Sequence, residues 1–316
     1  MTNFWKNLPQ PFTVLAPMEN VTDFAFREIV AKYLPKPDVM FTEFTNVEAL
    51  TSAGFEKTIP RFNFSPKQKP IVAQIWGLDP EAFYKSAKLV QKLKFDGIDI
   101  NMGCPDRAVI KAGAGSALIN NKNLAKEIIT AVKKGAGNLP VSVKTRIGFK
   151  SVVTSEWITF LLEQKIDALS IHARTAKQMS KGKPDWDEIK KAVEIKNQTA
   201  PNTVIIGNGD VESYSQVIEV HKKYGVEGVM IGRGIFKNPW VFDKSPKSKK
   251  HTQEEYTAVL LKHISLNEKT RNDPKSFEPM KKFFKMYINN FKGASILRQR
   301  LMETKNYSEA KKILEI

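Results

Sequence analysis

Short apolar runs alternate with amphipathic segments between residues 12 and 240 of the 316-residue chain. Most of these runs are continuous, which is typical of parallel strands that are covered on both faces. The segments between them repeat apolar residues at helical spacing. We therefore predict eight strands, at Thr13–Ala16, Asp38–Phe44, Ile71–Trp76, Gly97–Asn101, Val141–Arg146, Ala168–His172, Val204–Asn208 and Gly228–Gly232, and helices that include Pro80–Leu93, Asn123–Lys134, Ser155–Gln164, Asp187–Lys196 and Ser213–Tyr224.

Eight strands that alternate with helices over about 230 residues indicate an α/β fold, a (β/α)₈ TIM barrel. A doubly wound open sheet is the alternative. The pattern changes after Trp240, where a polar, lysine-rich linker from Asp243 to Gln253 precedes a segment that is helical in its periodicity up to Ile316. We predict a barrel domain at residues 1–243 and a small, basic, all-helical domain at residues 244–316.

Each predicted strand ends in small or polar residues. In a barrel these ends converge on one rim, where the active sites of this fold lie. Each residue taken alone has an ordinary structural explanation, such as a strand-end charge or a core histidine, but eight such coincidences are hard to explain in that way. The residues are Pro17 and Met18, Glu43, Gln74, Asn101 and Cys104, Lys144 and Arg146, His172 and Arg174, Asn208 to Asp210, and Gly232 to Gly234.

Glycine-rich turns follow the seventh and eighth predicted strands. Barrel enzymes commonly bind phosphate there, through backbone N–H groups, and Arg233 adds a charge-assisted donor. Neither Gly207-x-Gly209 nor Gly113-Ala-Gly-Ser116 continues as the dinucleotide-binding G-x-G-x-x-G motif. The turns predict a phosphorylated cofactor or substrate.

Cys104 is the only cysteine of the chain and follows the fourth predicted strand on a turn marked by Gly103 and Pro105. A free cysteine is usually a small, inert core residue, whereas a thiol on such a turn is well placed for chemistry. A single cysteine forms no internal disulfide, which fits the reducing cytoplasm. We expect no metal site, no membrane span and no signal peptide, because ligand spacing, a long apolar run and a charged leader are all missing.

The formal net charge is +17, and it is unevenly distributed. Residues 244–316 hold 17 Lys and Arg against 8 Asp and Glu, a net charge of +9 on less than a quarter of the chain. Clustered cations favour a polyanionic partner such as nucleic acid. A generally basic protein with solvated lysines is the alternative.

Specific motifs in this sequence resemble the tRNA-dihydrouridine synthase family over nearly the full chain. The combination of Asn-x-Gly-Cys-Pro with Lys-x-x-Gly-Ala-Gly-Ser is the most specific of them. The matching stretches are Leu15-Ala-Pro-Met18, Gln74, Asp99-Ile-Asn-Met-Gly-Cys-Pro105, Lys111-x-Gly113-Ala-Gly-Ser-Ala-Leu118, Val143-Lys144-x-Arg146, His172-x-Arg174-Thr175-x-x-Gln178, Gly207-Asn-Gly-Asp210, Gly232-Arg-Gly234, and Phe291-x-Gly293 with Arg298 and Arg300. The departures are Ala173, where the family has Gly, and Ser180, where it often has Tyr.

This resemblance implies an FMN enzyme that uses NADPH to reduce uridine in tRNA to 5,6-dihydrouridine. Cys104 is then the general acid that protonates uracil C5, because a thiol with an ordinary pKa is mostly protonated at neutral pH. A nucleophilic role would need a depressed pKa.

The family's site residues, transferred to matching positions, divide into two groups. The FMN contacts would be Pro17, Met18, Gln74, Lys144 and His172 at the ring, and Asn208, Gly209, Asp210, Gly232 and Arg233 at the phosphate. The substrate contacts would be Asn101, Lys111, Arg146, Arg174, Arg298 and Arg300. Lys111 to Ser116 would form a mobile loop near Cys104, and the basic helical domain would grip the tRNA backbone.

Two other functions remain open at this point. One is an FMN barrel oxidoreductase that acts on a free pyrimidine of the dihydroorotate type, which has no need of a basic helical extension. The other is a non-catalytic RNA-binding protein on a barrel scaffold. We expect a cytoplasmic protein and a monomer, and the sequence does not indicate which uridine is reduced.

Overall fold

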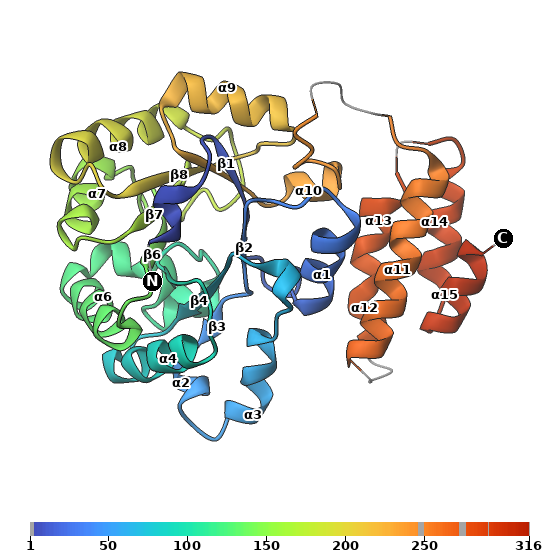
Figure 1. The fold of residues 1–316 in the computed structure, drawn as a ribbon, viewed down its shortest axis with the longest axis horizontal. Coiled ribbons are helices and arrows are strands. Elements are labelled where there is room, and N and C mark those ends of the chain that lie inside the picture. Colours follow the sequence, from blue (N-terminus) through green and yellow to red (C-terminus); the bar gives the residue numbers. More distant parts are fainter. Residues whose placement is uncertain (1–2, 246–249, 272–275, 290, 316) are drawn as a thin grey trace.

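The computed structural model describes residues 3–245, 250–271, 276–289 and 291–315. Parallel strands close into a barrel that is surrounded by helices (Figure 1). Closure comes from the pairing of the first strand with the last and of the second with the fourth, which excludes the open-sheet alternative. The barrel strands are β1 (Phe12–Leu15), β2 (Val39–Phe41), β4 (Ile71–Trp76), β5 (Gly97–Asn101), β6 (Val141–Arg146), β7 (Ala168–His172), β8 (Val204–Asn208) and β9 (Gly228–Ile231).

The second predicted strand was too long. β2 ends at Phe41, and the chain forms a separate short strand, β3 (Thr45–Asn46), that pairs with the far end of β4. The side chain of Thr42 replaces the ladder at the break: its Oγ1 accepts a hydrogen bond from the backbone N–H of Gln74 at 3.1 Å. A side-chain acceptor that competes with the backbone ends the strand early.

The main helices of the barrel begin at capping residues. Except for α7, each follows an Asp, Asn or Ser whose side-chain oxygen accepts a backbone N–H of the first turn. These helices are α1 (Phe24–Tyr33), α4 (Pro80–Lys92), α6 (Lys122–Ala136), α7 (Thr154–Glu163), α8 (Trp186–Thr199) and α9 (Tyr214–Tyr224). Shorter elements are η1 (Phe4–Asn7), α2 (Val47–Leu50), α3 (Phe55–Thr58), η2 (Ile59–Phe62), η3 (Pro66–Gln68), α5 (Arg107–Lys111), η4 (Gly115–Asn120) and α10 (Gly234–Lys237).

The carboxyl-terminal part of the chain is helical and lies on one side of the barrel, next to α1 and α10 (Figure 1). Its elements are α11 (Gln253–Arg271), α12 (Phe277–Met280), η6 (Lys281–Phe283), α13 (Phe284–Tyr287), α14 (Ala294–Glu303) and α15 (Tyr307–Leu314). Residues 246–249 of the predicted linker lie outside the described residues. We call residues 250–315 the helical segment.

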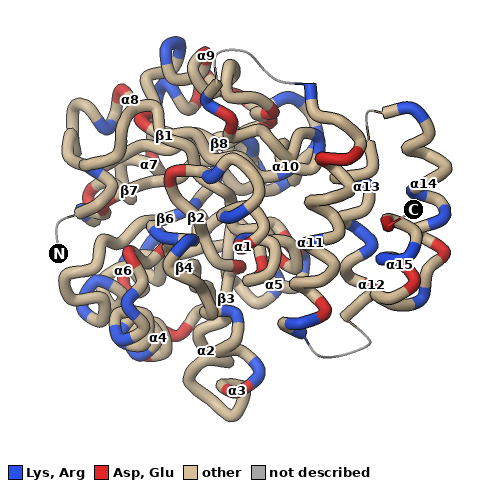
Figure 2. The backbone as a smooth tube through the Cα atoms, turned by 45° about the vertical axis from the view of Figure 1, so that its right-hand side comes forward, with Lys and Arg blue, Asp and Glu red and all other residues tan. Residues whose placement is uncertain are grey.

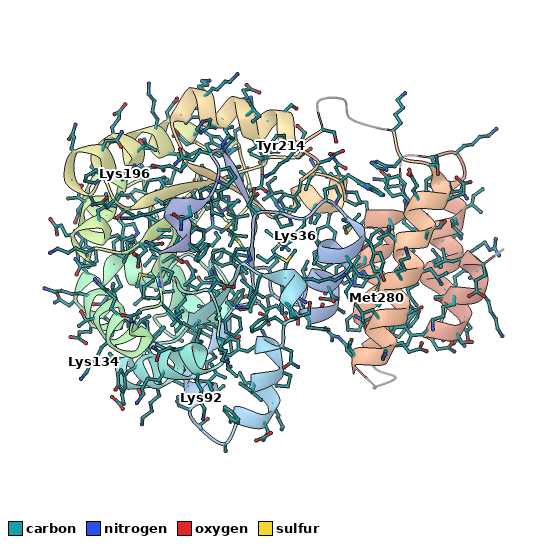
Figure 3. All side chains as sticks on the ribbon, in the orientation of Figure 1. Lys36, Lys92, Lys134, Lys196, Tyr214 and Met280 are labelled. Carbon is teal, nitrogen blue, oxygen red and sulfur yellow. The ribbon has the colours of Figure 1, made fainter. Side chains whose placement is uncertain are left out.

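Stacked aromatic rings join the helical segment to the barrel. Phe26 of α1 stacks on Phe283 with ring centroids 5.2 Å apart, and Phe236 of α10 stacks on Phe283 at 5.9 Å. Met280, labelled in Figure 3, is buried in the same apolar core, which runs without interruption from the barrel into the helical segment. Barrel and helical segment therefore share one hydrophobic core.

The two ends of the barrel differ. Trp5 of η1 packs against Phe12 at the start of β1, with ring centroids 6.0 Å apart, and so covers the amino-terminal end. The carboxyl-terminal end is hollowed by the cavity described below. Lys and Arg occur on both parts of the molecule, for example along α4 and α6 and along α14 and α15 (Figure 2). Among the described helices, none is long and apolar enough to cross a bilayer.

Candidate active site

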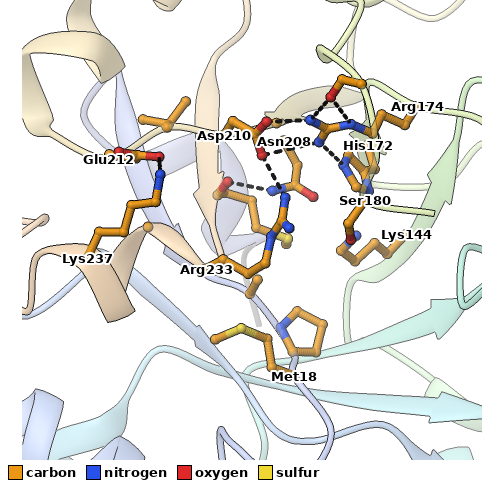
Figure 4. Close-up of a pocket in the computed structure, with 18 residues that line it drawn as sticks. Met18, Lys144, His172, Arg174, Ser180, Asn208, Asp210, Glu212, Arg233 and Lys237 are labelled. Carbon is orange, nitrogen blue, oxygen red and sulfur yellow. Dashed lines mark hydrogen bonds and ion pairs between the residues drawn. The ribbon is translucent and has the colours of Figure 1, made fainter. Parts of the chain in front are cut away.

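A cavity of about 440 Å³ lies at the carboxyl ends of the strands, between β1, β6, β7, β8 and β9 (Figure 4). This volume lies within the usual range of small-molecule sites. Ten of the predicted site residues line it: Pro17, Met18, Lys144, His172, Arg174, Asn208, Gly209, Asp210, Gly232 and Arg233.

Asp210 joins two arginines at one side of the cavity (Figure 4). The side chain of Arg174 is buried. It forms an ion pair with Asp210 and donates to the carbonyl oxygen of Gly182 at 2.6 Å. Arg233, whose side chain is 58 % exposed, donates to Asp210 at 2.8 Å. The hydrogen bond from Arg174 is the main reason that the pKa of Asp210 lies below its ordinary value. Asp210 is thus an ionised carboxylate that orients Arg233, and its predicted contact with a cofactor would be indirect.

Three residues of the cavity lining carry backbone N–H groups that we call the oxyanion cradle. In the described part of the chain, the N–H groups of Gly209, Gly232 and Arg233 have no protein acceptor. The side chain of Asn208 holds the adjoining turn, because its Nδ2 donates to the carbonyl oxygen of Met230 at 2.8 Å. Unsatisfied N–H groups beside a guanidinium are suited to an oxyanion such as a phosphate.

His172 is held neutral in a known tautomer. Its Nε2 lies 3.2 Å from a guanidinium nitrogen of Arg174, and because arginine only donates, Nε2 must be the acceptor. The ring proton therefore resides on Nδ1. Burial, followed by the charges of Arg146 and Lys144, holds the pKa of His172 well below its ordinary value. The imidazole is an uncharged N–H donor in the cavity wall.

Lys144 brings an uncommitted positive charge into the cavity. Within the described residues its ammonium has no hydrogen-bonding or ion-pair partner. Burial, together with the nearby charge of Arg146, lowers the pKa of Lys144 to about 8. At neutral pH the side chain is still mostly protonated, which makes it available to a developing negative charge on a bound ligand.

Cys104 lies outside the cavity lining, on the loop after β5, and is half-buried. Burial raises the pKa of the Cys104 thiol above its ordinary value, while Arg146 and Lys144 oppose that rise as weaker contributors. The thiol is therefore protonated at neutral pH. Gly115, with φ of +59°, packs so closely that an added Cβ would lie 2.9 Å from the carbonyl oxygen of Cys104, so this position requires glycine.

Buried amides support the Cys104 loop. Asn101 accepts hydrogen bonds from the backbone N–H groups of Gly103 and Cys104 at 3.1 and 2.9 Å. Gln74 lies behind Asn101, fully buried inside the barrel. Neither amide belongs to the cavity lining, and the hydrogen bond between them links the barrel core to the Cys104 loop.

Arg146 is committed to the protein's own carbonyl groups. Its guanidinium donates to Gly103 at 2.7 Å, to Met179 at 2.8 Å and to Thr175 at 3.1 Å. The side chain thus ties the Cys104 loop to the loop that follows β7. Its predicted contact with substrate stays a prediction, whereas its positioning of the Cys104 loop is visible.

Three further predicted residues lie away from the cavity lining. Lys111 is exposed at the end of α5, and Arg298 and Arg300 are on α14 of the helical segment. Arg298 donates to the carbonyl oxygen of Ile288 at 2.9 Å, which gives it a structural task in that segment. Arg300 is exposed. The structure brings none of the three into the cavity.

Sequence reasoning missed several lining residues and one buried acid. Ser180, noted only as a departure from the family pattern, lines the cavity, and Glu212 and Lys237 form an ion pair in the lining. These positions belong to irregular loops or a short helix, where no periodic pattern in the sequence indicates which way a side chain points. Asp99, buried in β5, had a usable signal: it is a lone carboxylate in an apolar strand.

No group of three or more His, Cys, Asp and Glu side chains in the described part of the chain is arranged to hold a metal ion. The candidate site consists of an oxyanion cradle, two arginines paired with one carboxylate, a neutral imidazole and a free ammonium. A protonated thiol lies on the neighbouring loop.

Solved structures with the same fold differ strongly in sequence. Morphinone reductase superposes with a TM-score of 0.51 at 11% identity, covering 75% of this chain and 86% of that one. Histamine dehydrogenase from Rhizobium sp. 4-9 superposes with a TM-score of 0.54 at 12% identity, covering 80% of this chain and 48% of that one. At such low identity these similarities support the barrel fold alone.

Sequence relatives are much closer. The family model for dihydrouridine synthase (Dus) matches residues 14–316. A "Probable tRNA-dihydrouridine synthase" of Staphylococcus aureus (strain COL) is 44% identical, with 99% of this chain and 95% of that protein covered. A "Probable tRNA-dihydrouridine synthase 2" of Bacillus subtilis (strain 168) is 43% identical, with 99% and 96% covered. Because both the model and the relatives span almost the whole chain, this protein belongs to the dihydrouridine synthase family.

Proposed function

We propose that the protein reduces specific uridines of tRNA to 5,6-dihydrouridine, using FMN that NADPH has reduced, with Cys104 as the general acid. The observation that carries the proposal is the presence, at one rim, of an oxyanion cradle, a half-buried lysine and, on the neighbouring loop, a protonated thiol. The cradle suits the phosphate of a cofactor, and the thiol holds a proton for a substrate carbon. The names of the relatives supply the substrate class.

The residues of the cavity fit FMN. The free N–H groups of Gly209, Gly232 and Arg233, with the Arg233 guanidinium, would hold its phosphate. Pro17 and Met18 would face its ring system. When bound, FMN supplies the hydride that is added to C6 of the uracil, after it has itself received one from NADPH.

Cys104 supplies the second hydrogen. Hydride addition at C6 leaves negative charge on C5 and on the neighbouring carbonyl oxygen of the uracil. The proton then moves from Cys104 Sγ to C5, which completes the reduction and leaves a thiolate that recovers a proton from solvent. Burial supports this role because it raises the pKa of the thiol and keeps it protonated until the carbon is basic enough to accept.

Lys144 and His172 would stabilise the charge that develops before this proton transfer. The ammonium of Lys144 has no protein partner in the described structure and reaches the cavity, and the Nδ1–H of His172 is a neutral donor in the same wall. Fixed donors in a partly buried site stabilise such charge more than water does. We therefore assign both residues to electrostatic stabilisation rather than to proton transfer.

Residues 244–316 would supply the basic tRNA-binding part of the protein. The target base must leave its stack to reach the cavity, and cations on the helical segment would hold the RNA backbone while it does so. Ser180, where the resemblance to the family predicts Tyr, lines the cavity and would leave more room beside the substrate than the larger ring.

The direct test is mass spectrometry of tRNA nucleosides after the protein, FMN and NADPH are incubated with unmodified tRNA. A gain of two hydrogen atoms at particular uridines is the expected result, and it also identifies the positions. Cellular tRNA that lacks only dihydrouridine serves as a second substrate. If neither RNA changes while NADPH reduces bound flavin normally, the proposed substrate is wrong, and reduction of a free pyrimidine is then tested in the same assay.

A further inference from the structure

A chain of buried hydrogen bonds runs from the barrel core to the Cys104 loop, and its direction is fixed at the loop end. A backbone N–H only donates, so the Asn101 atom that lies 2.9 Å from the N–H of Cys104 must be its oxygen. The amide nitrogen of Asn101 therefore faces Gln74, whose oxygen accepts from it at 3.0 Å. The nitrogen of Gln74 is then left to donate toward the core.

Asp99 fixes the direction at the other end. Its Oδ2 accepts from Nε2 of Gln74 at 2.7 Å, and its Oδ1 accepts from the hydroxyl of Ser142 at 2.6 Å. Asp99, Gln74 and Ser142 are fully buried, and Asn101 is 6% exposed, so water does not compete for these bonds. The carboxylate is the acceptor that makes a single orientation of both amides favourable.

We propose that Asp99 is a positioning residue for the reaction: through the oriented amides of Gln74 and Asn101, it holds the Cys104 loop where the thiol can deliver its proton. This inference rests on the proposed function, because only there does the thiol act as an acid. If Asp99 offered no acceptor, no hydrogen bond would favour the present orientation of the Gln74 amide. If that amide turned over, its nitrogen would face the nitrogen of Asn101, and the hydrogen bond between the two amides would be lost. The loop would then lose the acceptor for two backbone N–H groups.

The burial of Asp99 is consistent with a carboxylate that serves as the hydrogen-bond acceptor for Gln74. Burial raises the pKa of Asp99 to about 6, while its bonds from Ser142 and Gln74 and the charge of Lys144 oppose that rise. A buried carboxylate costs free energy that an apolar strand residue would not. The three residues that it organises, Gln74, Asn101 and Cys104, all belong to the predicted site.

The sharpest test exchanges donor and acceptor across one bond. Gln74→Glu places two carboxylates against each other and should disrupt the chain, whereas Gln74→Glu combined with Asp99→Asn restores one donor and one acceptor, with the direction toward Asn101 unchanged. Asp99→Asn alone should be tolerated, because its amide can present oxygen to Gln74 and nitrogen to the Ser142 hydroxyl. Asp99→Leu should disrupt, and Ser142→Ala is the matched control, since it removes a neighbouring bond and leaves the chain intact.

Two readouts need neither FMN nor tRNA. Hydrogen exchange of the Gly103 and Cys104 backbone N–H groups should become about tenfold faster or more when the chain is disrupted. Alkylation of Cys104, the only thiol of the chain, should accelerate in the same variants. Turnover with tRNA is the third readout and should fall and recover in parallel.

The results separate this inference from the proposed function. Slow exchange in the double variant with fast exchange in Gln74→Glu supports the positioning role, even if the parent protein reduces no tRNA. Equal exchange in these two variants, or a folded Asp99→Leu protein with Cys104 as protected as in the parent, would overturn it. If Asp99→Leu does not fold, the double variant Gln74→Glu with Asp99→Asn still tests the positioning role, because it keeps the sizes of both side chains and the total charge of the parent protein.

Discussion

The barrel rim and the helical segment use many of their charged residues differently. At the rim, the charges are either paired or removed from solvent: Arg174 and Arg233 converge on Asp210, and burial lowers the pKa of Lys144 to about 8. In the helical segment, cations such as Arg300 lie at the surface. The contact with the barrel is made mainly by apolar rings such as Phe283, with an ion pair between Arg271 and Asp23 beside them.

This difference teaches how the effects of mutations should be distributed. A charge that is fixed in a partly buried site acts on one atom of a ligand, so its removal has a large and specific effect. A solvated cation contributes to a shared attraction for a polyanion, so each one contributes little. The following variants test that contrast, from the largest expected effect to the smallest.

Cys104→Ala should reduce the rate of tRNA-dependent flavin reoxidation by about 10² to 10⁴, the usual contribution of a general acid. FMN binding should not change, because Cys104 lies outside the cavity lining. Single-turnover absorbance of the flavin measures both. A normal reoxidation rate in this variant would rule out the assigned proton donor.

Phe283→Ala should reduce the free energy of unfolding by about 3 to 5 kcal/mol, because it removes a buried ring that stacks on Phe26 and Phe236. Denaturant unfolding of the whole chain measures the loss. Ile296→Ala, an exposed change in the same segment, is the control. If unfolding occurs in two separate transitions and only the second is affected, the helical segment folds apart from the barrel.

Lys144→Met should reduce turnover about 10- to 100-fold, because the cavity loses its free cation. The pKa of Lys144 lies at about 8, so the ammonium is present below that pH and is lost above it. Turnover of the parent protein should therefore fall as the pH rises through about 8, and this decline should be absent in the variant. Lys237→Met, a cation paired with Glu212 in the same lining, should keep the decline.

Arg233→Met should weaken FMN binding by about tenfold, the lower end for a charge-assisted bond, since this guanidinium is 58 % exposed. Turnover at saturating FMN should stay close to normal. Equilibrium titration of the protein with FMN provides the affinity. An unchanged affinity would mean that the backbone N–H groups alone hold the phosphate.

Arg300→Glu should have the smallest effect. It should lower the dependence of tRNA affinity on salt concentration by about one unit of logarithmic slope, with NADPH oxidation by bound flavin unaltered. Lys134→Glu, an equal charge change on the outer face of the barrel (Figure 3), is the control. If both variants lose affinity equally, attraction to tRNA is spread over the whole surface.

Arg298→Glu serves as a comparison for this last variant, from which it should differ in one respect. Its guanidinium also donates to the carbonyl oxygen of Ile288, so this variant should lose thermal stability as well as tRNA affinity. Melting curves of the two variants make that comparison. Equal melting temperatures would show that the bond to Ile288 contributes nothing measurable.

The barrel was predictable because its strands are buried on both faces, and such strands have continuous apolar sequences. The one clear error, the length of the second strand, came from Thr42, whose hydroxyl takes the place of a backbone acceptor. No apolar count detects that competition. Ten lining residues were predictable for a topological reason: parallel strands in a closed barrel bring their carboxyl ends together, so position along the chain determines position at the rim.

The sequence by itself thus determined which elements form, which ends meet and which residue types gather there. Only the tertiary structure decided what each side chain does. It turned Arg146 toward carbonyl groups, set the proton of His172 on Nδ1, and linked Asp99 through two amides to Cys104. The physical reason is that hydrogen-bond direction and pKa depend on the partner and on burial, and both come from segments far apart in the chain.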